Sequence, residues 1–310
     1  MLFRSGLAQP WAAESVNWND DGSVDVVLRE GMKWHDGQPV TVEDVIFSFE
    51  APAQGTNAPM YKPFVEGIAS IERIDDRTVR FHLTEPNAAF ETSTLAKLNI
   101  APKHVWEPLL ANLAEGETAE SILEETRIGS GPFKFERWIT QQEVVLAANG
   151  DHWAAPKIDR WIIRIVPNIE ASLGMLRSGE INFMSDYTGD PEVLLGAAEE
   201  DGDLAIVESI DIGFQYLAFN LRRPPFDDKN FRKALSLAID RDLMVAAAWN
   251  GYAVKANSHV SPALGYWHDK STDELATGLE LAQQLLADGG YEVIDGRLHY
   301  PDGVTEQFTE

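Results

Sequence analysis

The sequence contains no cysteine, which excludes disulfides, thiolate metal sites and cysteine nucleophiles. It also lacks any apolar run near the roughly 18–20 residues that a membrane-spanning helix needs. Basic residues are few: 25 lysines and arginines stand against 50 aspartates and glutamates, for a formal net charge of -25. That charge repels phosphate backbones, so we expect no nucleic-acid partner. Either a well-solvated surface or adaptation to a saline medium explains the acidity.

Catalytic and cofactor-binding signatures are absent as well. The seven histidines include no pair at the i, i+4 spacing of a helical zinc site, so we expect no metal. Ser130 lies between two glycines but lacks the G-x-S-x-G frame of a nucleophile elbow, and no glycine-rich phosphate loop is present. We therefore predict no catalytic residue and no cofactor. An acid pair of the glycosidase type stays open, although no two carboxylates are singled out.

With 310 residues and 44% hydrophobic content, the chain can bury a substantial core and, at roughly 100–200 residues per domain, should form about two domains. Residues 23–29 and 77–84 alternate apolar and polar side chains, which predicts half-buried strands. Between them, Thr41 and Asp44 have the spacing of a capping box. A helix that packs one face on these strands should begin there.

The middle of the chain also mixes helices and strands. Residues 102–127 are rich in glutamate, leucine and alanine and are predicted to be helical, and the run from Ile128 to Pro132 then breaks regular structure. We place a domain boundary at this break. Two strands are predicted at residues 143–147 and 161–166, and a short helix at 169–178.

A third region begins near Leu204 with a predicted strand at 216–221 and a turn at Pro224-Pro225. Asp227 or Asp228 should cap the next helix, whose apolar face holds Phe231, Leu235, Ala238 and Ile239. The run Asp240-Arg241-Asp242 offers a second cap for a helix at 243–249, and residues 275–287 form another amphipathic pattern. The whole chain is therefore predicted to be mixed α/β.

The nine tryptophans carry information about packing and about ligand contact. Trp138, Trp153 and Trp161 flank strand patterns, so we interpret them as packing residues. Trp249 comes directly before Asn250-Gly251 at a predicted helix end, where an aromatic face can line a cleft.

Several segments, in order, resemble those of the extracellular solute-binding proteins of the peptide/nickel class, family 5. The most recognisable block runs from Leu28 through Trp34-His35-Asp36-Gly37. The other matching segments lie at residues 7–11, 19–22, 41–45, 74–79, 102–107, 129–133, 178–182, 219–221 and 224–228. Collinearity over so many separate motifs makes a chance match implausible.

The resemblance implies a two-lobed periplasmic-binding-protein fold of type II-like α/β architecture, with an extra subdomain. Residues 6–128 would form the extra subdomain and the edge of lobe 1, residues 129–204 the core of lobe 1, and residues 205–310 part of lobe 2. Because family members are longer, we expect the chain to be truncated at both ends, with the signal sequence missing and the second lobe incomplete.

The resemblance implies a binding protein and not an enzyme. It would capture a ligand, by default an oligopeptide, and deliver it to the permease of an ABC importer. An oligosaccharide is the alternative cargo, and a peptide or glycoside hydrolase is the outside alternative. The protein would act as a monomer in the periplasm or at the outer face of the cytoplasmic membrane.

The resemblance also implies a ligand site near two of its motifs. Asp186 and Tyr187 follow the segment 178–182, and Phe214 and Tyr216 precede Asn220. Strand alternation from 214 to 219 lets only one parity face a cleft, so Phe214 and Tyr216 go together. For Tyr187 and Phe214, ordinary packing is the alternative. The predicted ligand-binding residues are Asp186, Tyr187, Phe214, Tyr216, Asn220 and Trp249.

Overall fold

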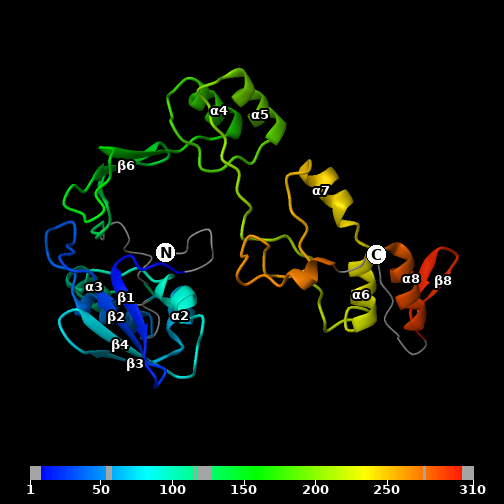
Figure 1. Ribbon diagram of the computed structural model, residues 1–310, viewed down its shortest axis with the longest axis horizontal. Helices are drawn as coiled ribbons and strands as arrows, with labels where there is room; N and C mark the ends of the chain where they lie inside the picture. The colour runs from blue at the N-terminus through cyan, green and yellow to red at the C-terminus, as the bar shows by residue number, and fades with distance from the viewer. Residues whose placement is uncertain (1–7, 54–57, 115, 118–126, 275–276, 302–310) are drawn as a thin grey trace. The chain divides into compact units, whose positions relative to one another are not determined.

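A computed structural model describes residues 8–53, 58–114, 116–117, 127–274 and 277–301 of the chain (Figure 1). These residues divide into two compact units, one ending at Met184 and one beginning at Ser185. This division falls within residues 129–204, the segment that the resemblance assigns to the core of lobe 1. Within the described ranges, no helix is both long and apolar enough to cross a bilayer.

The first unit opens with a four-stranded antiparallel sheet in the order β1-β2-β4-β3 (Figure 1). Its strands are β1 (Ala13–Trp18), β2 (Val24–Leu28), β3 (Ile68–Arg73) and β4 (Thr78–Leu83). The predicted strands at 23–29 and 77–84 are confirmed as the two central strands. Val24 and Phe81 are register partners, and both side chains are completely buried. The alternating pattern therefore points its apolar side into the core.

Helix α1 (Val42–Glu50) covers that core, as the capping pattern predicts. Its Val45 and Phe49 are buried, and the Phe49 ring lies 5.0 Å from the Phe81 ring, edge to face. Phe90 closes the same cluster at 5.5 Å from Phe81. Short elements border it: α2 (Lys62–Val65), a 3-10 turn (Ala51–Ala53) and a π-helical turn (Glu91–Leu95).

The buried carboxylate of Asp44 joins three segments of this unit. It accepts hydrogen bonds from the Thr41 amide (2.8 Å) and hydroxyl (2.9 Å), which fix the start of α1. It also accepts from the Lys103 amide at 2.8 Å, in the first turn of α3 (Lys103–Ala111). A fourth bond comes from the indole Nε1 of Trp34, 3.3 Å away. Asp44 thus satisfies free donors at the beginnings of two helices at once.

The imidazole of His35 joins the sheet region to the connection at residues 129–132. Its Nδ1 accepts from the Gly129 amide (3.2 Å), so the ring proton lies on Nε2, which donates to the Gly131 carbonyl (3.0 Å). The His35 amide adds a bond to the Gly129 carbonyl at 2.8 Å. A methyl group on Gly129 would lie 3.3 Å from the ring, so this close approach favours glycine.

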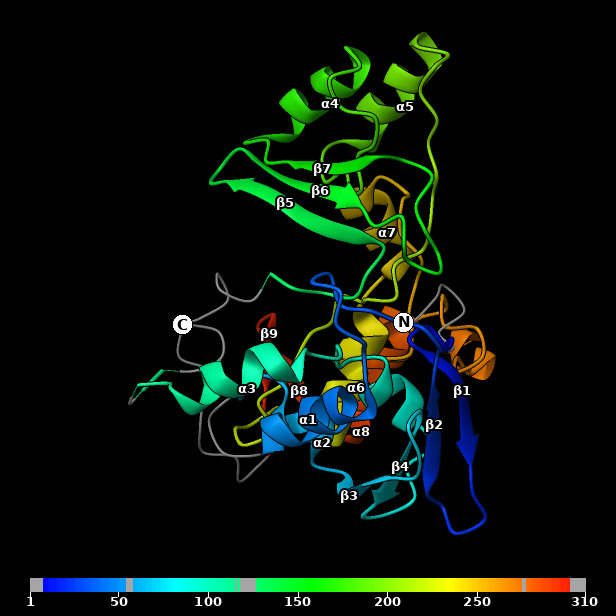
Figure 2. The ribbon, with the colours of Figure 1, turned by 90° about the vertical axis from the view of Figure 1, so that its left-hand side faces the viewer.

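A second sheet follows that connection, with β5 (Phe133–Ile139), β6 (Glu143–Ala148) and β7 (Arg160–Arg164) side by side and antiparallel (Figure 2). Helix α4 (Ile169–Arg177) ends the unit, capped by Asn168. Trp138, Trp153 and Trp161 keep 47%, 43% and 42% of their surfaces exposed. The Trp153 ring still packs on Trp11 at 4.5 Å and the Trp161 ring lies 6.2 Å from Phe133, so the interpretation as packing residues holds in part. In this narrow sheet Val145 of the middle strand is fully buried, while every residue of β7 is exposed.

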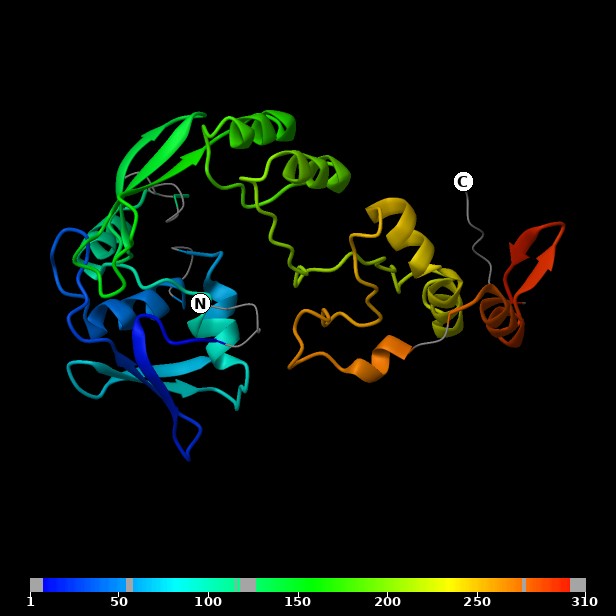
Figure 3. The ribbon, with the colours of Figure 1, turned by 45° about the horizontal axis from the view of Figure 1, so that its top comes forward.

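The second unit is mainly helical, with α5 (Pro191–Glu200), α6 (Lys229–Ala238), α7 (Arg241–Trp249), a 3-10 turn (Lys270–Glu274) and α8 (Leu279–Asp288). Asp228 and Asp240 cap α6 and α7, which confirms a cap at each predicted site, although α7 begins at Arg241 and not at 243. Helices α6 and α8 pack together, and the hairpin β8 (Glu292–Ile294) and β9 (Arg297–His299) follows α8 (Figure 3). Phe231 and Ala234 form the buried face of α6, whereas Ile239 lies beyond the helix end.

The helix predicted at 102–127 is much shorter in the structure. Helix α3 stops at Ala111, where the Asn112 side chain donates to the Pro108 carbonyl at 2.6 Å. Pro108 has no amide hydrogen and weakens the helix from inside. Residues 115 and 118–126 of the predicted helix lie outside the described residues.

We expect Asp44→Asn to lower the free energy of unfolding by about 3 kcal/mol or more, because an amide brings two donors to a site already filled with donors. Urea unfolding followed by circular dichroism measures the loss. Asp20→Asn, at an exposed aspartate, should change stability by less than about 0.5 kcal/mol. Equal losses for the two variants would show that the Asp44 network contributes little.

Burial, with the nearby Lys134 ammonium, lowers the pKa of His35, although its bond to Gly131 acts in the opposite direction. Burial also lowers the pKa of His152. The folded chain therefore binds fewer protons than the unfolded chain, and stability should fall as pH drops below about 6.5. Urea midpoints at about pH 7.5 and 5.5 should differ less for His35→Gln than for the unmodified chain. The exposed His259→Gln should keep the full difference; an unchanged difference in His35→Gln would contradict this account.

Candidate functional site

All six residues predicted to bind ligand lie in the second unit. The structure brings Phe214 and Tyr216 together, with their ring centroids 5.6 Å apart and the planes tilted by 52°. Tyr216 is 75% exposed, so the pair presents an open aromatic surface. Such a surface can stack on an apolar side chain or a sugar ring, and the phenol can exchange a hydrogen bond.

The strand predicted at 216–221 is wrong, because these residues adopt no regular structure. A strand needs a neighbour for its amides and carbonyls, and no described strand of the second unit pairs with this segment. The Asn220 carbonyl instead accepts from the Arg223 amide in a turn, at 3.2 Å. The pairing of Phe214 with Tyr216 therefore comes from direct ring contact and not from the alternation of a pleated strand.

Among the described contacts, only that between Phe214 and Tyr216 joins two of the six predicted residues, and the other four have separate surroundings. Tyr187 is half-buried against the backbone of Gly189, where an added methyl group would lie 2.7 Å from the phenol oxygen. Asp186 is exposed beside it. The Asn220 side chain turns back to accept from the Arg222 amide at 3.2 Å. Trp249 ends α7 and is 48% exposed.

Stacked aromatic rings hold the irregular segment in place. Phe219 stacks on Phe226 at 5.6 Å, Phe226 meets Phe231 of α6 at 5.9 Å, and Phe231 meets Tyr291 at 5.5 Å. Burial and a hydrogen bond to the Asp228 carboxylate raise the pKa of Tyr291. The same carboxylate accepts from the Asn230 amide at 2.8 Å to cap α6. The segment that carries Tyr216 is thereby anchored at one end to a rigid helix.

Two further contacts in this unit were not anticipated. The buried Ser261 hydroxyl donates to the Asp211 carbonyl at 3.0 Å, which ties a later loop to the start of the aromatic segment. The Tyr252 phenol donates to Glu192 of α5 at 3.1 Å and links α5 to the end of α7. These pairs are 50 and 60 residues apart in sequence, so no local spacing rule could reveal them.

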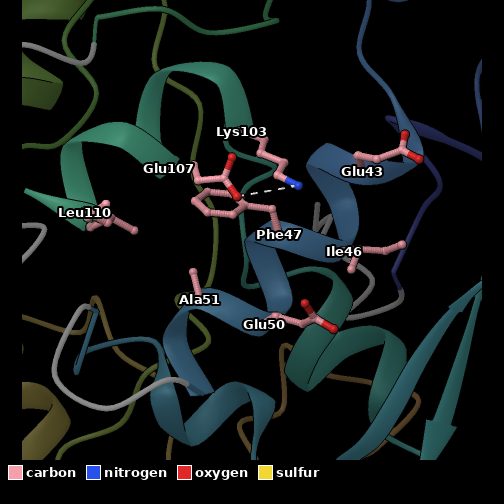
Figure 4. Close-up of a pocket in the computed structure, with 9 residues that line it drawn as sticks. Glu43, Ile46, Phe47, Glu50, Ala51, Lys103, Glu107 and Leu110 are labelled. Carbon is pink, nitrogen blue, oxygen red and sulfur yellow. Dashed lines mark ion pairs between the residues drawn. The ribbon is translucent and has the colours of Figure 1, made fainter.

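The first unit carries a groove of about 310 Å³ between α1 and α3 (Figure 4). Side chains from both helices point toward it, and the Lys103 ammonium pairs with Glu107 at 3.6 Å along one wall. The lining residues are Glu43, Ile46, Phe47, Glu50, Ala51, Lys103, Glu107, Leu110 and Ala111. None of them was singled out as a site residue from the sequence.

The part of the chain that the structure describes holds no group of three or more histidine, cysteine, aspartate or glutamate side chains able to bind a metal. The second unit instead presents the exposed aromatic pair of Phe214 and Tyr216. Such a surface fits recognition of an organic ligand by stacking and hydrogen bonding.

The family model for bacterial extracellular solute-binding proteins, family 5 Middle, matches residues 8–309. The chain belongs to this family. Its oligopeptide-binding relative AppA of Bacillus subtilis is 29% identical over 299 residues, which cover 95% of this chain and 53% of that protein. The family 5 chain thus spans about half the length of the curated relatives it matches.

Solved structures agree with the family assignment. The structure of Bacillus subtilis AppA in complex with a nonapeptide has a TM-score of 0.70 and 28% identity, and the match covers 98% of this chain and 60% of that one. A periplasmic oligopeptide-binding protein of Thermotoga maritima with bound mannohexaose has a TM-score of 0.65 and 25% identity, over 96% and 57% of the two chains. These likenesses confirm the predicted α/β solute-binding-protein fold; the incomplete second lobe stays a prediction.

Proposed function

We propose that the protein containing this chain captures an oligopeptide outside the cytoplasmic membrane and delivers it to the permease of an ABC importer. The observation that carries the proposal is the match over nearly the whole chain to an oligopeptide-binding protein whose structure holds a nonapeptide. The protein acts by binding and release, with no chemical step. It works as a monomer in the periplasm or on a lipid anchor.

In this proposal the aromatic pair Phe214 and Tyr216 forms part of the ligand surface, with Asp186, Tyr187, Asn220 and Trp249 around it. Stacking on an aromatic ring is tolerant of side-chain identity, because it needs only a flat or apolar partner. Peptide binders that accept many sequences combine such contacts with backbone hydrogen bonds and ordered water. The exposed phenol of Tyr216 suits both roles.

An oligosaccharide is the second candidate cargo. The Thermotoga maritima relative supports this candidate. That protein shares the fold and is named for oligopeptides, yet its structure contains mannohexaose. Exposed aromatic faces such as Trp249 also stack on sugar rings. The two cargo classes differ in their polar contacts: a peptide offers amides and charged termini, whereas a sugar offers hydroxyl groups.

Native mass spectrometry of the full-length protein with an equimolar pool of oligopeptides, and separately with mannohexaose, tests the proposal. We expect one peptide per protein molecule and quantitative recovery of that peptide uncut. Retention of mannohexaose alone would favour the sugar cargo. Time-dependent cleavage of either pool would establish a hydrolase and overturn the proposal.

Replacement of Tyr216 by alanine should weaken peptide binding by about 1–3 kcal/mol, because both the ring contact and the hydroxyl bond are lost. Calorimetry on the full-length protein measures the change, and Tyr216→Phe should retain the stacking part. Tyr266→Ala is a matched control, since that tyrosine is 73% exposed in the same unit. Unchanged affinity in Tyr216→Ala, with an unchanged melting curve, would remove Tyr216 from the site.

A further inference from the structure

The groove between α1 and α3 combines an apolar floor with an acidic rim (Figure 4). Its floor is made by Ile46 and Phe47 of α1 and by Leu110 of α3, all of them half-buried. An apolar floor of this kind gains free energy when a partner's apolar side chain displaces water from it. The charged residues around the rim then determine whether a cationic or an anionic partner is favoured.

The rim carries more negative than positive charge. Three glutamates, Glu43, Glu50 and Glu107, line the groove, and Lys103 is the one cation among the described lining residues. Lys103 is already paired with Glu107, and Glu43 is paired with Arg73. The Glu50 carboxylate has no hydrogen bond or ion pair within the described ranges. One rim carboxylate is thus available to an incoming cation.

The groove runs along both helices, from the first-turn residues Glu43 and Lys103 to their C-terminal ends. Glu50 is the last residue of α1, and Ala51 and Ala111 place the C-terminal ends of α1 and α3 at the groove. The carbonyl groups at a helix C-terminus carry partial negative charge, which stabilises a nearby cation and destabilises a nearby carboxylate. Neither helix has a basic residue in its last turn. A cation that binds beside Glu50 would compensate this carboxylate and the C-terminal end of α1 together.

We propose that this groove docks a cationic, amphipathic peptide segment. A large apolar side chain of the partner lies on the floor, and a flanking arginine or lysine pairs with Glu50 at the C-terminal end of α1. The acidic rim excludes anionic lipid headgroups and nucleic acid by repulsion. The groove residues belong to the first unit and every predicted cargo residue belongs to the second, so the two proposed sites share no residue.

Nuclear magnetic resonance titration tests the proposal on isotope-labelled full-length protein. The probe is an acetylated and amidated tripeptide with arginine on both sides of leucine, and its mirror probe has glutamate in place of arginine. Blocked ends keep the probe from acting as a peptide cargo recognised by its charged termini. We expect saturable shifts confined to α1, α3 and their neighbours for the arginine probe, and none for the glutamate probe.

Glu50→Gln should weaken binding of the arginine probe by about two- to fivefold, and Glu50→Lys by more, because each removes attraction at the helix ends. Glu85→Gln, at an exposed glutamate without a described partner, should bind like the unmodified protein. Equal binding of the two probes, shifts outside this region, or no shift at millimolar probe would overturn the docking site. None of these results would affect the proposed transport function.

Discussion

A carboxylate buried in protein must find hydrogen-bond donors, and Asp44 finds four of them in three separate segments. Two come from the start of α1, one from the start of α3 and one from Trp34. The loop before α1 and both helices are therefore fixed to one point. The sheet core beneath α1 and the groove between α1 and α3 both depend on this arrangement.

The second unit has a different physical character. Its helices are joined by long irregular segments, and stacked rings from Phe219 to Tyr291 attach one such segment to α6. Several aromatic side chains remain exposed, above all Tyr216, which we propose as part of the ligand surface. The chain thus combines a rigid hydrogen-bonded unit with a unit whose exposed aromatic surface suits capture. This combination agrees with membership of a family of extracellular solute-binding proteins.

Local patterns in the sequence predicted local structure well. The Thr41 and Asp44 spacing, the Asp228 and Asp240 caps and the alternation in β2 and β4 each involve neighbouring residues, and the structure confirms them. Long-range contacts were beyond such patterns: no spacing rule connects Asp44 to Lys103. The strand at 216–221 failed for the same reason, since alternation alone cannot supply a pairing partner. The proximity of Phe214 and Tyr216 was anticipated, but the groove was not.

Hydrogen–deuterium exchange on the full-length protein, with and without a neutral oligopeptide that has free termini, tests most directly where cargo binds. The account predicts slower exchange on peptide addition around residues 214–221 and at the end of α7 near Trp249. It predicts no change around Asp44 or in α1 and α3, whose amides are already held in the free protein. Protection confined to the first unit, with none around Tyr216, would contradict the account.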